Sequence, residues 1–346
     1  MITARGPLHV GMKCNMECPF CYYTYVTERT WASVHKLKYH ARLFREQYGA
    51  THAEITGGEP TIYPHAVELV RYCRGIGLKP TLITNMQALT MRKLQEFKDA
   101  GIQDFLCSVY AYKDRYNKIV GTSKAWGQVE QALGVMEAIG IPFRVNCVLT
   151  SFSYPDLPDI AAFCVDHGAK VINFISYNPF YGWTDKAPDF QLKHSDIAPK
   201  LNAVLRYLDE QGVEANVRYV PFCFLREHPE KCYNYPQLSY DLGEWQFRSW
   251  YSESTDLPYG QHPDKIWQDK PVEEVNYAIA RSHKENLYVT ANPCKQCTRF
   301  SICDGLTKQY YRRFGDKELE PFCDAEDMVS GPDCFIEGRK KYLESV

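Results

Sequence analysis

The chain has no apolar run that approaches the about 18–20 residues needed to span a membrane. Its first fourteen residues include Arg5 and Lys13 and contain no long apolar segment, so they do not have the pattern of a secretory signal. With neither feature in the sequence, we expect a cytoplasmic protein that has no membrane partner.

The chain also lacks an excess of charge of either sign. Lys and Arg together number 40, Asp and Glu number 42, and hydrophobic residues make up 45% of the 346 residues. This composition excludes a disordered chain, and the absence of a basic arm argues against a nucleic-acid partner. Because domains cluster near about 100–200 residues, the length predicts two domains, or one large barrel with an appendage.

Cysteine, by contrast, is abundant, with 14 residues in the chain. Without an export signal, metal ligation is a better explanation for them than disulfides. Two groups are dense enough to suggest ligands, and they are Cys14, Cys18 and Cys21, and Cys294, Cys297 and Cys303. Isolated cysteines are expected to be small buried apolar side chains, and these are Cys73, Cys107, Cys147 and Cys164.

Short β-rich runs alternate with helical stripes between residues 7 and 220, which predicts βα units around a parallel sheet. The predicted strands are Leu8–Met12, Ala53–Thr56, Thr81–Asn85, Phe105–Tyr110, Phe143–Leu149, Val171–Ser176 and, less clearly, Ala215–Val220. Six or seven units are too few to close an eight-fold barrel. The predicted fold is therefore α/β, an open partial TIM barrel of the (β/α)6 type over residues 1–221.

The βα rhythm is lost after about residue 221, and residues 222–346 are predicted to form a smaller, irregular α+β domain. Within it, the segment 233–267 is rich in tyrosine and tryptophan. Two explanations stay open for this segment. It could form an aromatic mini-core that packs on the barrel, or it could line a substrate cavity.

The first cysteine group follows the first predicted strand, so its three thiolates lie on a loop at the carboxyl end of that strand. Barrel active sites are built at this end. The spacing Cys14-x3-Cys18-x2-Cys21 supplies three ligands, which is one too few for a structural zinc or a fully protein-ligated 4Fe–4S cluster. One iron of a cluster would remain open for a substrate. Zinc with a distant fourth ligand is the alternative.

A glycine-rich turn, Thr56-Gly57-Gly58-Glu59-Pro60, comes directly after the second predicted strand. The two glycines let the backbone approach a ligand closely, and the Glu59 carboxylate could receive a ligand's ammonium group. Alone, this sequence would indicate only a tight turn. Because the turn comes one βα unit after the cysteine loop, we expect the two motifs to contribute to the same site.

Together these motifs resemble those of the radical S-adenosylmethionine (radical SAM) enzymes, over about the first 220 residues. The resemblance implies that Cys14, Cys18 and Cys21 hold a 4Fe–4S cluster and that Phe20 lies next to the adenine of SAM. It implies that Gly57, Gly58, Glu59 and Pro60 form the site for the methionyl amino group. It also implies reductive cleavage of SAM to a 5'-deoxyadenosyl radical, which abstracts hydrogen from a substrate, with a flavodoxin- or ferredoxin-type electron donor.

Polar side chains near other strand ends are further candidates for SAM contacts. The period-two pattern of Phe143–Leu149 puts Arg144 and Asn146 on one face of the strand. In related enzymes, the corresponding strands contribute a polar residue to the SAM ribose and a basic or amide group to its carboxylate. The resemblance therefore indicates Ser108, Arg144 and Asn146, with Thr84 and Asn85 as further candidates. Each could instead be a satisfied interior polar group.

The second group, Cys294-x2-Cys297-x5-Cys303, resembles the distal part of the SPASM/twitch auxiliary-cluster domains. The full SPASM pattern continues with a further cysteine, where this chain has Thr307. The resemblance therefore implies one auxiliary 4Fe–4S cluster, closer to a twitch arrangement. Cys223 is the first choice for its fourth ligand, and the alternatives are Cys232, Cys323, Cys334 or an open iron. Zinc would suit four thiolates equally well.

The substrate is the least constrained feature. Peptide-modifying members of the group commonly carry an N-terminal domain that grips a leader peptide, and the cluster motif at Cys14 leaves no room for one. A small biosynthetic intermediate, such as a nucleoside or sugar, is therefore favoured, with net oxidation or rearrangement assisted by the auxiliary cluster. A radical SAM peptide maturase is the alternative. A zinc-stabilised binding protein and a ferredoxin-like electron carrier are the hypotheses outside this chemistry.

Overall fold

The computed structural model describes residues 5–21, 29–46, 49–177, 190–240 and 284–324, together with positions 326, 328, 329, 331, 333–335 and 342. The aromatic-rich segment 233–267 lies outside the described residues from position 241 onward. Neither explanation of that segment is therefore addressed by the structure.

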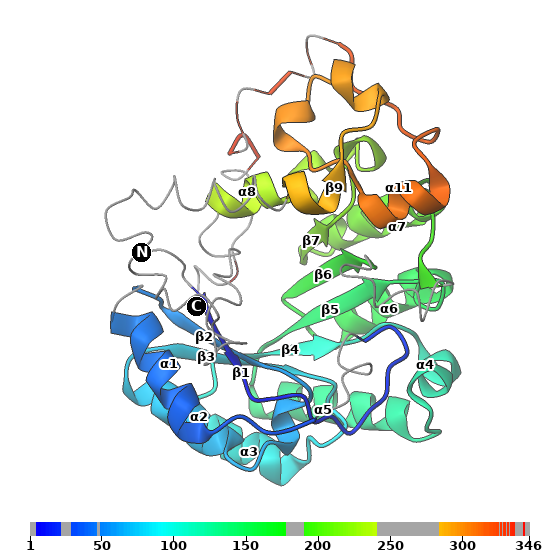
Figure 1. Ribbon diagram of the computed structural model, residues 1–346. Helices are drawn as coiled ribbons and strands as arrows, with labels where there is room; N and C mark the ends of the chain where they lie inside the picture. The colour runs from blue at the N-terminus through cyan, green and yellow to red at the C-terminus, as the bar shows by residue number, and fades with distance from the viewer. Residues whose placement is uncertain are drawn as a thin grey trace.

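A single parallel sheet dominates the described chain, and its strands follow one another in sequence order from β1 to β8 (Figure 1). The strands are β1 (Arg5–His9), β2 (His52–Thr56), β3 (Lys79–Thr84), β4 (Asp104–Ser108), β5 (Phe143–Leu149), β6 (Val171–Ser176), β7 (Glu214–Arg218) and β8 (Cys232–Tyr233). Because β1 and β8 are the two edges, the sheet is an open partial barrel, as predicted. It has one strand more than expected and continues past residue 221.

Helices connect the strands and lie along the outer, convex side of the sheet (Figure 1). They are α1 (Val34–Glu46), α2 (Ala66–Gly75), α3 (Met91–Ala100), α4 (Lys113–Val120), α5 (Ala125–Ile139), α6 (Leu157–Asp166) and α7 (His194–Glu210). Each buries an apolar stripe, as α2 does with Leu69, Val70 and Cys73. The helices therefore cover one face of the sheet and leave the other face to the barrel interior.

The two faces of the sheet differ in polarity. On the outer face, Phe105 and Cys107 of β4 are fully buried, and the ring of Phe105 meets Phe97 of α3 edge-on at 5.7 Å. The inner face carries polar side chains such as Asp104 and Asn146. The four isolated cysteines are fully buried as predicted, namely Cys73, Cys107, Cys147 and Cys164.

The cysteine-rich C-terminal region packs against α7, near the β7 end of the sheet (Figure 1). Its elements are η6 (Phe222–Phe224), η7 (Pro229–Lys231), α8 (Tyr235–Tyr240), β9 (Tyr288–Val289), η8 (Pro293–Gln296), η9 (Phe300–Ile302), β10 (Leu306–Thr307) and α11 (Lys308–Phe314). The Tyr310 ring stacks on His194 at 4.3 Å, and its hydroxyl accepts a hydrogen bond from the His194 N–H at 2.6 Å. This contact fixes α11 to the barrel.

Within the described ranges, none of the helices combines the length and the apolar character that a membrane crossing requires.

Candidate active site

Three strand ends converge on the first cysteine group. Cys14, Cys18 and Cys21 lie on the loop after β1, where the Cys21 N–H donates to the Cys18 carbonyl at 2.9 Å. Asn85, after β3, donates through Nδ2 to the Cys14 sulfur at 3.6 Å. The Tyr110 hydroxyl, after β4, lies 3.0 Å from the Cys18 sulfur. The cysteines therefore lie at the carboxyl ends of the strands, as predicted from the fold.

The two glycines of the turn after β2 pack directly on the segment that leads to Cys14. Gly57 has φ +137°, and a Cβ there would lie 2.5 Å from the Gly11 carbonyl oxygen. A Cβ on Gly58 would lie 2.0 Å from the Lys13 carbonyl oxygen. The Gly58 N–H donates to the Gly11 carbonyl at 2.8 Å. Only glycine fits this backbone contact, whereas contact of either glycine with SAM stays a prediction.

Glu59 is buried and holds the ends of two strands together. Its Oε1 accepts hydrogen bonds from the Thr61 N–H at 2.9 Å and hydroxyl at 2.5 Å, and from the Thr84 hydroxyl at 2.7 Å. Its Oε2 accepts one from the Asn85 N–H at 2.7 Å. Burial raises the pKa of Glu59, and these donors oppose that shift. Within the described part of the chain, Oε2 accepts a hydrogen bond from the Asn85 N–H alone, so it has capacity for a ligand's ammonium group.

The other predicted residues lie at different depths along the strands. Pro60 begins the short helix η2 (Pro60–Ile62), for which Glu59 is the N-cap. Phe20 is buried, and its ring meets Tyr110 edge-on at 4.8 Å. Ser108 is the half-buried last residue of β4 and pairs in register with Asn146 of β5. Phe20, Ser108 and Asn146 therefore line the carboxyl half of the barrel near the cysteine loop.

Arg144 has partners other than the expected one. It is the second residue of β5, toward the amino end of the strand, and is 3% exposed. Its Nε donates to Asp104 at 2.5 Å, and its Nη2 donates to Asp104 and Thr81, each at 3.3 Å. The guanidinium is thus committed to a buried ion pair. A contact with SAM stays a prediction that this geometry does not support.

The inner face also holds a line of three asparagines, of which the sequence prediction includes only Asn146. Asn173 donates through Nδ2 to Asn146 Oδ1 at 3.0 Å, and Asn216 donates through Nδ2 to Asn173 Oδ1 at 3.0 Å. The three residues pair in register on β5, β6 and β7. The signal available in the sequence was an asparagine inside each of three predicted strands, Phe143–Leu149, Val171–Ser176 and Ala215–Val220.

The first cysteine group suits an iron–sulfur cluster better than zinc. Tetrahedral zinc, with Zn–S bonds of about 2.3 Å, would bring its thiolates to within about 4 Å of one another. Among the described residues, no three cysteine sulfurs lie within 4.8 Å of one another. Burial raises the pKa of Cys14 to about 11 and that of Cys18 to about 12, so thiolates at this position need a bound cation.

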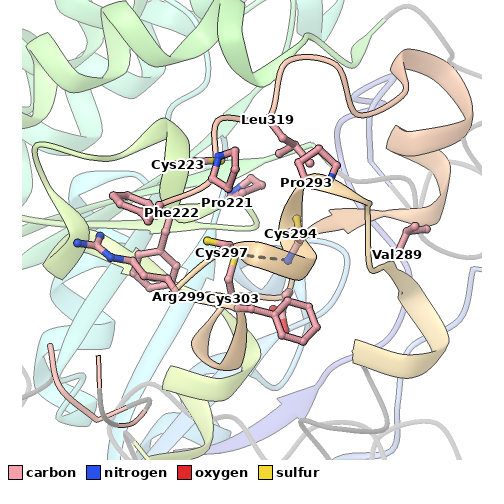
Figure 2. Close-up of a pocket in the computed structure, with 15 residues that line it drawn as sticks. Pro221, Phe222, Cys223, Val289, Pro293, Cys294, Cys297, Arg299, Cys303 and Leu319 are labelled. Carbon is pink, nitrogen blue, oxygen red and sulfur yellow. Dashed lines mark hydrogen bonds between the residues drawn. The ribbon is translucent and has the colours of Figure 1, made fainter. Parts of the chain in front are cut away.

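A cavity of about 460 Å³, including its open mouth, lies in the C-terminal region, and Figure 2 shows four cysteines around it. They are Cys223, Cys294, Cys297 and Cys303. Of the alternatives for the fourth position, Cys232 is buried against the Val220 carbonyl, and Cys323 and Cys334 are exposed. None of these three lines the cavity. The structure thus brings the first-choice residue, Cys223, to the other three cysteines.

The cavity wall around these cysteines is largely apolar, with Phe222 and Phe322 among its residues. Burial raises the pKa of Cys223 and Cys294, and it raises that of Cys303 to about 12. Among the described residues, no three of these cysteine sulfurs lie within 4.8 Å of one another, as tetrahedral zinc would require. The donor set therefore fits a second iron–sulfur cluster.

The open parallel barrel places the chain in the partial TIM-barrel class, and the three cysteines beside the Gly-Gly-Glu turn at its strand ends fit an iron–sulfur cluster. Residues 8–164 match the family model of the Radical SAM superfamily, which confirms the resemblance drawn from the sequence motifs. The match supports a 4Fe–4S cluster and SAM as the cofactors, as predicted.

Three proteins that this chain resembles are named for peptides or were solved with them. The PqqA peptide cyclase of Methylocella silvestris is 26% identical over 174 residues, which cover 49% of this chain and 46% of that protein. SuiB of Streptococcus suis, bound to precursor peptide SuiA, superposes with a TM-score of 0.63 at 17% identity, over 93% of this chain and 75% of SuiB. Native anSMEcpe, with bound AdoMet and Cp18Cys peptide, has a TM-score of 0.56 at 16% identity and covers 92% of each chain.

The alignment thus spans less than half the length of the curated cyclase, and the two solved structures support the fold alone. The preference for a small-molecule substrate over a peptide is nevertheless wrong, since these relatives are named for peptide substrates or were solved with peptides. That preference depended on the position of Cys14 in the sequence, which does not describe the surface that meets a substrate.

Proposed function

We propose that this chain is a radical SAM enzyme that modifies a peptide. In this proposal, residues 1–221 carry the SAM cluster on Cys14, Cys18 and Cys21, and residues 222–346 carry an auxiliary 4Fe–4S cluster. The ligands of the auxiliary cluster are Cys223, Cys294, Cys297 and Cys303. The observation that carries the proposal is the presence of two separate cysteine sets, one after β1 and the other beginning directly after β7, near opposite edges of one open sheet.

Cys14, Cys18 and Cys21 would hold a 4Fe–4S cluster, and SAM would bind at the coordination position that these three cysteines do not fill. When bound, the cluster and SAM together supply a 5'-deoxyadenosyl radical. Phe20 contributes an apolar surface for the adenine, and Glu59 Oε2 accepts the methionyl ammonium. Ser108 and Asn146 offer hydrogen bonds to the ribose and carboxylate, while the barrel interior excludes water from the reacting atoms.

The asparagine line on the inner face supports a peptide as the substrate. A peptide backbone carries an N–H and a C=O at nearly every residue, and these groups need partners when they leave water. Asn146, Asn173 and Asn216 present side-chain amides with the same donor and acceptor chemistry. The peptide names of the relatives independently favour this substrate class.

The four cysteines of the C-terminal cavity bear on the type of reaction. Cys223, Cys294, Cys297 and Cys303 would together hold an auxiliary 4Fe–4S cluster, which would supply a one-electron acceptor near the peptide. With such an acceptor, the modification would be a net oxidation of the peptide, such as a cross-link. The apolar wall of its cavity limits solvent access to the cluster, which is one of the features that set its potential.

The test uses the anaerobically reconstituted protein with SAM and dithionite. Synthetic peptides encoded by short reading frames beside the gene are supplied with deuterated side chains, and 5'-deoxyadenosine is analysed by mass spectrometry. We expect deuterium in this product with at least one peptide, and no product from the Cys14→Ala variant. Formation of 5'-deoxyadenosine without deuterium from any peptide, but with deuterium from a nucleoside or sugar, would reject the peptide assignment.

A further inference from the structure

The hydroxyl of Tyr110 lies 3.0 Å from the sulfur of Cys18, a contact between residues far apart in sequence. Tyr110 follows β4, whereas Cys18 lies on the loop after β1. Both are buried, with 5% and 9% exposure. Because water has little access to either group, this contact is a defined feature of the cysteine loop.

Neighbouring rings hold Tyr110 in place from two sides. Phe20 meets its ring edge-on at 4.8 Å, and Tyr116 of α4 stacks on it at 5.3 Å with an interplanar angle of 20°. Tyr116 is fully buried and in turn packs against Trp126 at 5.7 Å. The hydroxyl is therefore aimed at Cys18 by packing.

Ligation of iron by Cys18 is part of the proposed function, and it determines which of the two groups donates this hydrogen bond. An iron-bound thiolate has no proton, so it can only accept, and Tyr110 is the donor. Donation withdraws electron density from the sulfur and favours the reduced, more negative cluster. We propose that Tyr110 is a positioning residue that raises the reduction potential of the SAM cluster through Cys18.

The electron balance of this step is simple. One electron passes from an external one-electron reductant to the cluster, and the Tyr110 proton stays on its oxygen. The Cys14 sulfur has longer contacts, from the Met16 N–H at 3.4 Å and from Asn85 Nδ2 at 3.6 Å. The Tyr110 hydroxyl thus lies closer to the Cys18 sulfur than either of these two donors lies to the Cys14 sulfur.

The test measures the midpoint potential of the SAM cluster in the full reconstituted chain. The cluster is identified by the electron paramagnetic resonance signal that changes when SAM is added. In Tyr110→Phe we expect the equilibrium constant for reduction to fall about tenfold, which is about 59 mV for a one-electron couple. Tyr63→Phe is the matched control, because it removes a buried hydroxyl that donates to the Ala32 carbonyl and not to a cysteine. An unchanged midpoint in a cluster-loaded Tyr110→Phe enzyme would overturn the inference.

A second variant covers the case in which Tyr110→Phe does not load its cluster. Incorporation of 3-fluorotyrosine at position 110 keeps the ring and makes the hydroxyl a stronger donor, so the midpoint should rise. A fall or no change would overturn the inference. Failure of the proposed function looks different, since Cys18→Ala would then retain the SAM-responsive cluster with full iron and sulfide content.

Discussion

The carboxylate of Glu59 accepts a hydrogen bond from the backbone N–H of Asn85 at 2.7 Å, which joins the turn after β2 to the end of β3. Asn85 also donates through its side chain to Cys14 at 3.6 Å and to Asn15 at 2.9 Å. The ends of β1, β2 and β3 are therefore linked at the cysteine loop by one buried carboxylate and one amide.

Replacing Glu59 with Gln should weaken this link. The Gln amide would turn an N–H2 group toward one of the donors that Glu59 now accepts, so a buried hydrogen bond is lost. We expect the free energy of unfolding to fall by about 1–3 kcal/mol, measured by urea denaturation of the metal-free protein. The control is Glu68→Gln, whose exposed carboxylate should matter by less than about 0.5 kcal/mol. Equal losses in both variants would contradict the role of Glu59.

Removal of Arg144 should destabilise the barrel. Arg144→Ala leaves Asp104, which is fully buried, without its cationic partner. The expected loss is about 3–5 kcal/mol of unfolding free energy, again from urea denaturation. Arg115→Ala breaks the more exposed pair with Asp156 and should cost at most about 1 kcal/mol. If Arg144→Ala leaves the free energy of unfolding unchanged and lowers only the affinity for SAM, the ion-pair role is wrong and Arg144 contacts SAM as the sequence resemblance implied.

The auxiliary site should be separable from the first site. Cys297→Ala should remove about half of the bound iron, because only one of two clusters loses a ligand. SAM cleavage should persist, uncoupled from product formation. Cys323→Ala is the matched control, since this cysteine is exposed and does not line the cavity. Iron analysis and 5'-deoxyadenosine assays check both variants. Full iron in Cys297→Ala would exclude the second cluster from this cavity.

Acid should loosen the packing of the C-terminal region on α7. Burial lowers the pKa of His194 from 6.5 to about 3, so the fold requires the neutral ring. Its contribution to stability is present above pH 6.5 and is lost as the pH falls toward 3. His194→Phe should retain the stack on Tyr310. Its free energy of unfolding should fall by a few kcal/mol less than that of the unsubstituted protein as the pH is lowered. The exposed His35→Phe should leave the curve unchanged, and denaturation from pH 7 to 4 compares the two variants.

Local patterns account for most of the fold and for the cysteine ligand candidates. Alternation over Phe143–Leu149 predicts β5 with its observed bounds, because the pattern reflects burial on one face. The two-residue strand β8 has no such pattern and exists only through its pairing with β7. Cys223 could be predicted because it directly follows the last predicted strand.

Contacts between segments that are distant in the sequence could not be predicted from local patterns. Arg144 and Asn146 share a face, yet the position of Asp104 on another strand decides that Arg144 forms an ion pair. The contact between Tyr110 and Cys18 likewise depends on the register of β1 through β4, which no local pattern states. The sequence motifs alone led to the wrong substrate class, because they describe the cofactor site and not the surface that would meet a substrate.

The backbone contacts of Gly57 and Gly58 with the segment before Cys14 bear on how the cysteine loop behaves without a bound cluster. Because these contacts come from sheet packing, we expect the cysteine loop to keep its shape when the metal is absent. Zinc fingers, in contrast, unfold when their metal leaves. We therefore expect a chain that has lost its cluster to bind a new one without first unfolding.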